Sequence, residues 1–421
     1  MATVVVTNLQ AQKEAVMTAV LDRAESRRYL PRTAAFAGIS AAMVAILVAA
    51  GAPTPLWPIY QHEWGFPSWL LTLAFGVYAL ALLVAILVIG SLSDHIGRRP
   101  LMIGALALEL VAMLAFLFAP GIGWLIVARV VQGVATGAAS SSLSAAVVEL
   151  APERQKKLGA MMTSMAPLAG LGIGALFAGV LAEFASDAAF AVWLVLVVVM
   201  VAGTIFTLFT PETVSRKPGA LASLKPQVKL PVQVRRLYAS ALPGIVSSFF
   251  LMTLFMGLIP VVLVAVFTVD SPVAGSLAAF VAFGAGTVLS ATTSSLKPHR
   301  LRLAGTSAMT VGAILFVGSI GAHSLTLLWV ASLIAGAGIG AAFAGTTRGL
   351  VPEVAPHERA GIFTAIYLAG YLAMGLSAIV AGLVVGVVGV ASMATGFGVV
   401  TALVALAGVI ATAGLHRKDK K

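Results

Sequence analysis

Two ionisable residues interrupt the long apolar runs of this 421-residue chain, and they are the first candidates for chemistry. Glu109 lies in "LMIGALALELVAMLAFLFAP" and Arg129 lies in "IGWLIVARVVQGVATG". If both runs are helical, the residues lie about 13 Å and about 12 Å from the ends of their runs. A carboxylate and a guanidinium at that depth lower each other's burial cost, directly or through water. The pair is a candidate proton carrier; the alternatives are a static structural pair and a protonated Glu109 that is simply hydrogen-bonded.

Polar side chains follow Arg129 at helical spacing. Gln132, Thr136 and Ser140 recur every three or four residues and therefore share one face of a helix. In a membrane helix such a stripe faces protein or a water-filled cavity rather than lipid. We expect Gln132, Thr136 and Ser140 to line a substrate cavity.

The elements that position these residues follow from composition. The chain is 60% hydrophobic and only 10% charged, whereas soluble domains carry roughly 25% charged residues. Apolar runs of about 20 residues recur, and that length crosses a bilayer as a helix. The sequence has no cysteine, which excludes disulfides and thiolate sites. We predict an all-α membrane protein.

Twelve apolar segments are predicted to span the membrane. Turn signals such as "APGIG" at 119–123 and "VDSP" at 269–272 separate them. The predicted spans lie near 34–58, 68–92, 100–119, 122–149, 158–182, 188–210, 237–267, 272–295, 303–321, 324–350, 360–385 and 388–414.

The basic residues predict the orientation of these spans. Of the 26 lysines and arginines, 25 fall in the two tails and in alternate connections, and the remaining one is Arg129. Because positive residues stay on the cytoplasmic side, both termini are expected in the cytoplasm of a multi-pass plasma-membrane protein. The net charge of +11 is thus a topology signal, with anionic lipid and no nucleic acid as its implied partner.

The chain divides into two similar halves. "VVELAPERQKKLGAMM" at 147–162 parallels "LVPEVAPHERAGIFTA" at 350–365. Six spans in each half give two repeats of the same orientation, with a central site between them. We predict a cytoplasmic tail (1–33), a six-helix bundle (34–210), a cytoplasmic linker (211–236), a second six-helix bundle (237–414) and a short cytoplasmic tail (415–421).

Two motifs resemble those of the major facilitator superfamily. "GSLSDHIGRRPLMIG" at 90–104 is similar to that family's signature between spans 2 and 3, and "RVVQGVATGAA" is similar to its fourth-span signature. "PET" at 211–213 also fits the family. The resemblance covers the chain from about residue 34 and implies the major facilitator fold, with the fourth span beside a central cavity.

The charged hairpin is expected to act as a conformational latch. Gly97 suits a tight turn, and the Asp94 carboxylate can accept hydrogen bonds from a helix N-terminus. The resemblance implies that Asp94 contacts the beginning of span 11 when the cavity opens outward, while Arg98 holds Asp94 and Glu149. The predicted latch residues are Gly90, Asp94, Gly97, Arg98, Arg99 and Glu149.

Glycines in spans 4 and 5 are predicted to pack helices closely. "MAPLAGLGIGALFAGVLAE" resembles the antiporter signature of the family, but alanines replace its proline at 175 and one glycine at 178. The predicted packing residues are Gly133, Gly137, Gly170, Gly174 and Gly179.

Aromatic residues and methionines in span 7 suit a soft pocket for varied apolar ligands, with plain packing as the alternative. The candidates are Phe249, Phe250, Met252, Phe255 and Met256. In span 1, Trp57 and Tyr60 are expected to be anchors at the membrane interface.

These features favour a monomeric secondary transporter that exports small apolar or cationic compounds in exchange for protons. A metabolite or sugar exporter or a facilitator is one alternative, and a non-transporting sensor or scaffold is another. No Gly-rich phosphate loop is present, which argues against direct use of ATP. The six histidines lack metal-ligand spacing, so neither enzyme, cofactor nor metal is expected.

Overall fold

The computed structural model describes residues 29–226, 230–293, 295–355 and 358–418, and the described part of the chain is helical. A helix satisfies its own backbone hydrogen bonds, as a segment in hydrocarbon must. The first half contains α2 (Arg32–Gly51), η1 (Thr54–Leu56), α3 (Trp57–Trp64), α4 (Trp69–Ile89), α5 (Ser93–Ile96), α6 (Arg98–Leu117), α7 (Ile122–Leu150), η2 (Glu153–Gln155), α8 (Lys156–Phe184) and α9 (Ala188–Leu208).

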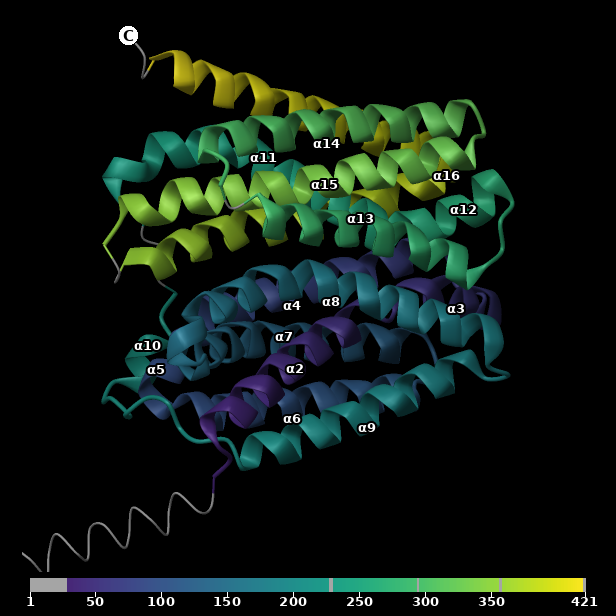
Figure 1. The fold of residues 1–421 in the computed structure, drawn as a ribbon. Helices are drawn as coiled ribbons and strands as arrows, with labels where there is room; N and C mark the ends of the chain where they lie inside the picture. The colour runs from purple at the N-terminus through teal and green to yellow at the C-terminus, as the bar shows by residue number, and fades with distance from the viewer. Residues whose placement is uncertain (1–28, 227–229, 294, 356–357, 419–421) are drawn as a thin grey trace, which may run out of the picture.

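The second half follows a connection that contains the short α10 (Ala220–Ser223) and η3 (Val232–Val234). Its helical elements are α11 (Arg235–Thr253), the π-helical η4 (Leu254–Leu258), α12 (Ile259–Phe267), α13 (Pro272–Thr292), α14 (Pro298–Gly321), α15 (Leu325–Leu350), η5 (Val351–Glu353) and α16 (Arg359–Lys418). In Figure 1 the helices of the first half lie below those of the second half.

The described chain contains 11 helical segments long and apolar enough to cross a membrane, and the last of them holds two of the predicted spans. This segment, Arg359–Leu415, has 57 residues, which is about 85 Å of helix and far more than a bilayer needs. Its helix turns at Gly389, where φ is 80° and ψ is 167°. Beyond the turn, Gly398 lies beside Phe316 and Gly408 lies beside Thr306, so the second part runs back along α14. The twelve-helix fold is thereby recovered.

The two halves meet along two pairs of helices, α4 with α16 and α8 with α13. Gly382 packs so closely on α4 that a Cβ there would lie 1.8 Å from Thr72 Oγ1. A Cβ at Gly179 would lie 2.0 Å from Ser276 Oγ. Because α4 and α13 begin near these contacts and α8 ends there, both contacts lie at one end of the bundle. We call it the Thr72 end, and the opposite end, which carries the charged hairpin, the Asp94 end.

Two large hydrophobic cores fill the described part of the molecule, beside a small third cluster of Leu301, Ala341 and Ala344. One is built from buried residues of the first half, including Trp57 and Trp193. The other fills the second half and extends across the interface to Phe75, Tyr78 and Leu168. The interface therefore continues the second core onto α4 and α8.

Candidate functional site

Glu109 is completely buried in the middle of α6. Gln132 on α7 donates a hydrogen bond from Nε2 to Glu109 Oε1 at 3.1 Å. The Thr136 hydroxyl approaches Oε2 at 3.4 Å. Both carboxyl oxygens therefore have polar partners from the neighbouring helix.

Arg129 lies one turn before Gln132 on α7 and is 1% exposed. Its guanidinium donates a hydrogen bond to Gln132 Oε1 at 2.6 Å. The same group stacks over the Tyr78 ring at 4.4 Å and near the Trp57 ring at 5.4 Å. Aromatic faces attract a cation most strongly where water is excluded, so these rings help to hold the buried charge.

Gln132 therefore connects the two ionisable groups. None of the three ion pairs in the described chain includes Glu109 or Arg129. In place of a direct pair, an amide connects the two groups: its oxygen accepts from Arg129 and its nitrogen donates to Glu109. Residues three apart on a helix are neighbours. The Gln132 side chain therefore reaches Arg129 on its own helix and Glu109 on α6.

The Gln132 amide also reaches the break in the first span. Its nitrogen donates a second hydrogen bond to the Ala49 carbonyl at 3.0 Å. In an uninterrupted helix this carbonyl would accept from the N–H of residue 53, but residue 53 is proline and has none. The chain then continues into η1 and α3, so Gln132 links the ionisable pair to the point where the first span breaks.

Trp57 and Tyr60 are not interfacial anchors, which corrects the expectation from their positions. They are 1% and 3% exposed. The Tyr60 hydroxyl accepts a hydrogen bond from the Trp193 indole at 2.5 Å. The prolines around them turn the chain inward, so both rings pack inside the first half.

On α7, the hydroxyl-bearing residues of the polar stripe bind the helix backbone, whereas the glycines between them pack against α4. Thr136 and Ser140 donate to the backbone carbonyls one turn earlier, and Ser140 is half-buried. Gly133 and Gly137 pack against the backbone of α4, where a Cβ would lie 2.5 Å from Tyr78 O and 2.7 Å from Leu82 O, respectively. On α8, Gly170 and Gly174 contact α2, and Gly179 contacts α13.

The charged hairpin forms a cluster within the first half. Arg98 pairs with Asp94 at 2.5 Å and with Glu149 at 3.2 Å. The second oxygen of Glu149 accepts a hydrogen bond from Thr213 at 2.5 Å. Arg99 packs over the Tyr29 ring at 4.9 Å and donates to the Leu208 carbonyl.

Glu212 completes this cluster, a role that the sequence interpretation did not assign. Its carboxylate accepts hydrogen bonds from the backbone N–H groups of Arg98 at 2.9 Å and Arg99 at 3.1 Å. Gly97 has φ of 104°, and a Cβ there would lie 2.5 Å from Glu212, so glycine is required. Gly90, by contrast, has an ordinary helical φ of −54°. Glu212 is the middle residue of the "PET" motif, and this motif was the sequence signal that could have indicated its role.

The predicted contact between Asp94 and the beginning of span 11 is not made in this conformation. Among the residues described, no hydrogen bond or ion pair joins Asp94 to Arg359 or to the following turn of α16. The Asp94 side chain is 47% exposed.

The residues predicted to form a pocket in span 7 are mostly buried in packing contacts. Phe249 meets Tyr371 edge-on at 5.1 Å, and Phe255 meets Phe283 in the same way at 6.3 Å. Met256 accepts a hydrogen bond from Thr54 across the interface at 3.6 Å. Met252 is also buried, whereas Phe250 is partly exposed beside Phe397.

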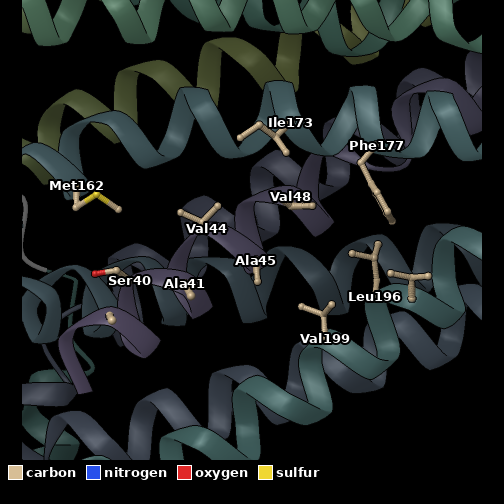
Figure 2. Close-up of a pocket in the computed structure, with 12 residues that line it drawn as sticks. Ser40, Ala41, Val44, Ala45, Val48, Met162, Ile173, Phe177, Leu196 and Val199 are labelled. Carbon is tan, nitrogen blue, oxygen red and sulfur yellow. The ribbon is translucent and has the colours of Figure 1, made fainter. Parts of the chain in front are cut away.

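A groove of about 590 Å³ lies elsewhere, between α2, α8 and α9. Figure 2 shows Ala41, Ala45 and Val48 on α2 between side chains of the other two helices. None of the predicted cavity residues lines this groove. In the part of the chain that the structure describes, no cluster of three acidic or histidine side chains could hold a metal ion.

Comparisons with known proteins agree with this architecture. The human organic anion transporter MFSD10 (TETRAN) has a similar fold, with a TM-score of 0.63 and 18% identity over 90% of this chain and 100% of that one. The MFS transporter paaT of Penicillium rubens is 29% identical over 127 residues, which are 30% of this chain and 23% of paaT. A D-xylose transporter of Levilactobacillus brevis is 30% identical over 96 residues, or 23% of this chain and 21% of that protein. The aligned segments thus span less than a quarter of these two relatives.

A sequence model of the Major Facilitator Superfamily matches residues 34–378, which is most of the chain. The helical architecture, the motifs and this match lead to one conclusion: the chain belongs to the Major Facilitator Superfamily of membrane transporters.

Proposed function

We propose that this protein is a secondary active transporter that exports small apolar or cationic compounds in exchange for protons by alternating access. The observation that carries the proposal is the buried chain Glu109–Gln132–Arg129. A charge in the middle of a membrane costs about 2.5–3.5 kcal/mol even on the lenient insertion scale. A titratable carboxyl at that depth, connected to a cation, suits proton transfer.

A proton on Glu109 changes the hydrogen bonds around it. An ionised carboxylate only accepts, whereas a protonated one also donates. The Thr136 hydroxyl already donates to the Gln132 carbonyl at 2.8 Å, so a protonated Oε2 can donate to this hydroxyl, whereas an ionised Oε2 cannot. Because Gln132 also binds Arg129 and the Ala49 carbonyl, proton occupancy acts on α2 and α7 together.

The packing of the halves supports alternating access. We place both termini in the cytoplasm of a plasma-membrane monomer, with bundles at 34–210 and 237–414. The Thr72 end is then the outer end, and it is closed by the contacts of α4 with α16 and α8 with α13. We therefore assign this conformation to the inward-facing state, in which Asp94 is 47% exposed and paired with Arg98, and we assign its contact with span 11 to the outward-facing state.

The proposal is tested with purified protein in vesicles that carry an imposed pH gradient. We expect gradient-dependent accumulation of members of a panel of apolar and cationic compounds. Accumulation that only reaches equilibrium would indicate the alternative, a facilitator. Movement of none of the compounds, sugars included, would favour a sensor or scaffold.

A further inference from the structure

Arg302 is a buried cation whose side chain has few partners. It lies in the second turn of α14 and is 4% exposed. Within the described chain, its guanidinium donates one long hydrogen bond, from Nη1 to the Leu237 carbonyl at 3.5 Å, and its Nε has no partner. None of the ion pairs in that part of the chain includes it. A buried charge without a counter-charge is costly, so this site calls for an anion.

A second unpartnered polar atom lies on α16. Thr412 is 2% exposed, and its hydroxyl has no hydrogen-bond partner among the described residues. Other threonines on this helix donate to the carbonyl four residues earlier, as Thr401 does to Phe397 at 2.7 Å. The Thr412 hydroxyl is therefore buried but not used by its own helix.

The helix register brings these two residues to the same level. Gly408 on α16 packs against Thr306 on α14 and Gly244 on α11. One turn further toward the Asp94 end, the same faces of α16 and α14 carry Thr412 and Arg302. The register thus places a buried guanidinium and a buried hydroxyl at one level, on faces of α14 and α16 that both adjoin α11.

The surroundings are positively charged. Arg235 and Arg236 lie exposed at the beginning of α11, and Lys297 and Arg300 lie exposed at the beginning of α14. Arg302 follows Pro298, the first residue of α14, by four residues, about 6 Å along the helix axis. At this depth in a membrane, the phosphate groups of lipids are the nearest abundant anions.

We propose that Arg302 and Thr412 bind a phosphate group, which their depth assigns to the headgroup of an anionic phospholipid. A guanidinium presents several N–H donors in a planar fork that matches phosphate oxygens, and a hydroxyl adds a further donor. Basic pockets between membrane helices bind lipid headgroups in this way. The site is separate from the Glu109 chain and does not depend on the proposed export function.

The test uses the purified full-length protein in phosphatidylcholine micelles, titrated with phosphatidylglycerol. The retained lipid is measured by native mass spectrometry, and the unfolding temperature is recorded in parallel. We expect Arg302→Gln to raise the half-saturating lipid concentration about tenfold, since it removes charged hydrogen bonds, and Thr412→Val to raise it less. The matched controls are Arg300→Gln, an exposed cation two residues away, and Thr395→Val, a partly exposed threonine on α16. Both should bind lipid within about twofold of the unmodified protein.

A second arm replaces the lipid with inorganic phosphate. If millimolar phosphate raises the unfolding temperature of the unmodified protein but not of Arg302→Gln, and phosphatidylglycerol does not, the site stands and free phosphate is its ligand. Equal losses in Arg300→Gln and Arg302→Gln would overturn the proposal, because the effect would then be one of diffuse surface charge. If Arg302→Gln does not fold, Thr412→Val decides: binding equal to that of Thr395→Val would also overturn the proposal.

Discussion

Glu183 on α8 accepts a hydrogen bond from Ser271 at 2.9 Å and so joins the two halves of the chain at the Thr72 end. Ser271 is the N-cap of α13, and the same Glu183 oxygen lies 3.4 Å from the Val273 N–H in the first turn. A carboxylate near a helix N-terminus is stabilised by the partial positive charge there. This arrangement is the counterpart, at the closed end, of the contact proposed for Asp94 at the other end.

Replacing Glu183 should therefore weaken closure of the Thr72 end. A charge at a helix N-terminus contributes about 0.3–1 kcal/mol, and up to about 2 kcal/mol when partly buried. We expect Glu183→Gln to shift a nearly balanced equilibrium several-fold toward the conformation open at this end. Spin-label distances between the halves report the shift. Asp187→Asn is the control, because Asp187 caps its own helix by accepting from Phe190 at 3.0 Å; equal distance distributions for the two variants would contradict the role of Glu183.

Gly382 gives a steric version of the same test. A side chain at this position would clash with Thr72, whereas a Cβ at Gly386 would have no atom within 4 Å. Gly382→Val should hold the Thr72 end apart, and Gly386→Val, one turn later on the same helix, should not. Cross-linking yield between cysteines placed on α4 and α16 at this end should fall only in the first variant. A yield unaffected by Gly382→Val would mean that the two helices do not need this close approach.

Asp94→Asn should act in the opposite direction. Among the described residues, Asp94 pairs within the first half in this conformation, with Arg98 at 2.5 Å. Removing its charge therefore disfavours mainly the other conformation, in which we place it at the beginning of span 11. Spin-label distances at the Asp94 end should show a larger inward-facing population, by several-fold at most. An unchanged distribution together with unimpaired transport would exclude the latch.

The spans could be predicted because hydrophobic length alone defines them, and the turn at Gly389 separates two predicted spans at 360–385 and 388–414. The end at which the halves meet could not be predicted. Gly382 and Gly179 form close contacts at one end, but an alternating transporter uses the same helices to close the other end. A sequence pattern specifies the faces that pack and not the conformation adopted.

The candidate site was predicted in part. Glu109 and Arg129 stood out because ionisable residues are rare inside spans. The connection of Glu109 to Arg129 through Gln132 depends on the orientation of the Gln132 side chain. The hydrogen bond from Gln132 to the Ala49 carbonyl depends on the missing N–H of Pro53, which is far from Gln132 in sequence. Trp57 was misplaced because amphipathic aromatic rings suit both an interface and a buried cation.

The central claim, that Glu109 carries the coupled proton, is tested most directly by accumulation in vesicles under an imposed pH gradient. One pH unit provides about 1.4 kcal/mol per proton, enough for about tenfold accumulation. Glu109→Gln should abolish accumulation while retaining substrate binding, and Arg129→Ala should impair both. Glu153→Gln, which changes an exposed carboxylate paired with Lys156 outside the spans, should accumulate substrate normally. Uphill transport by Glu109→Gln at the rate of the unmodified protein would contradict the account.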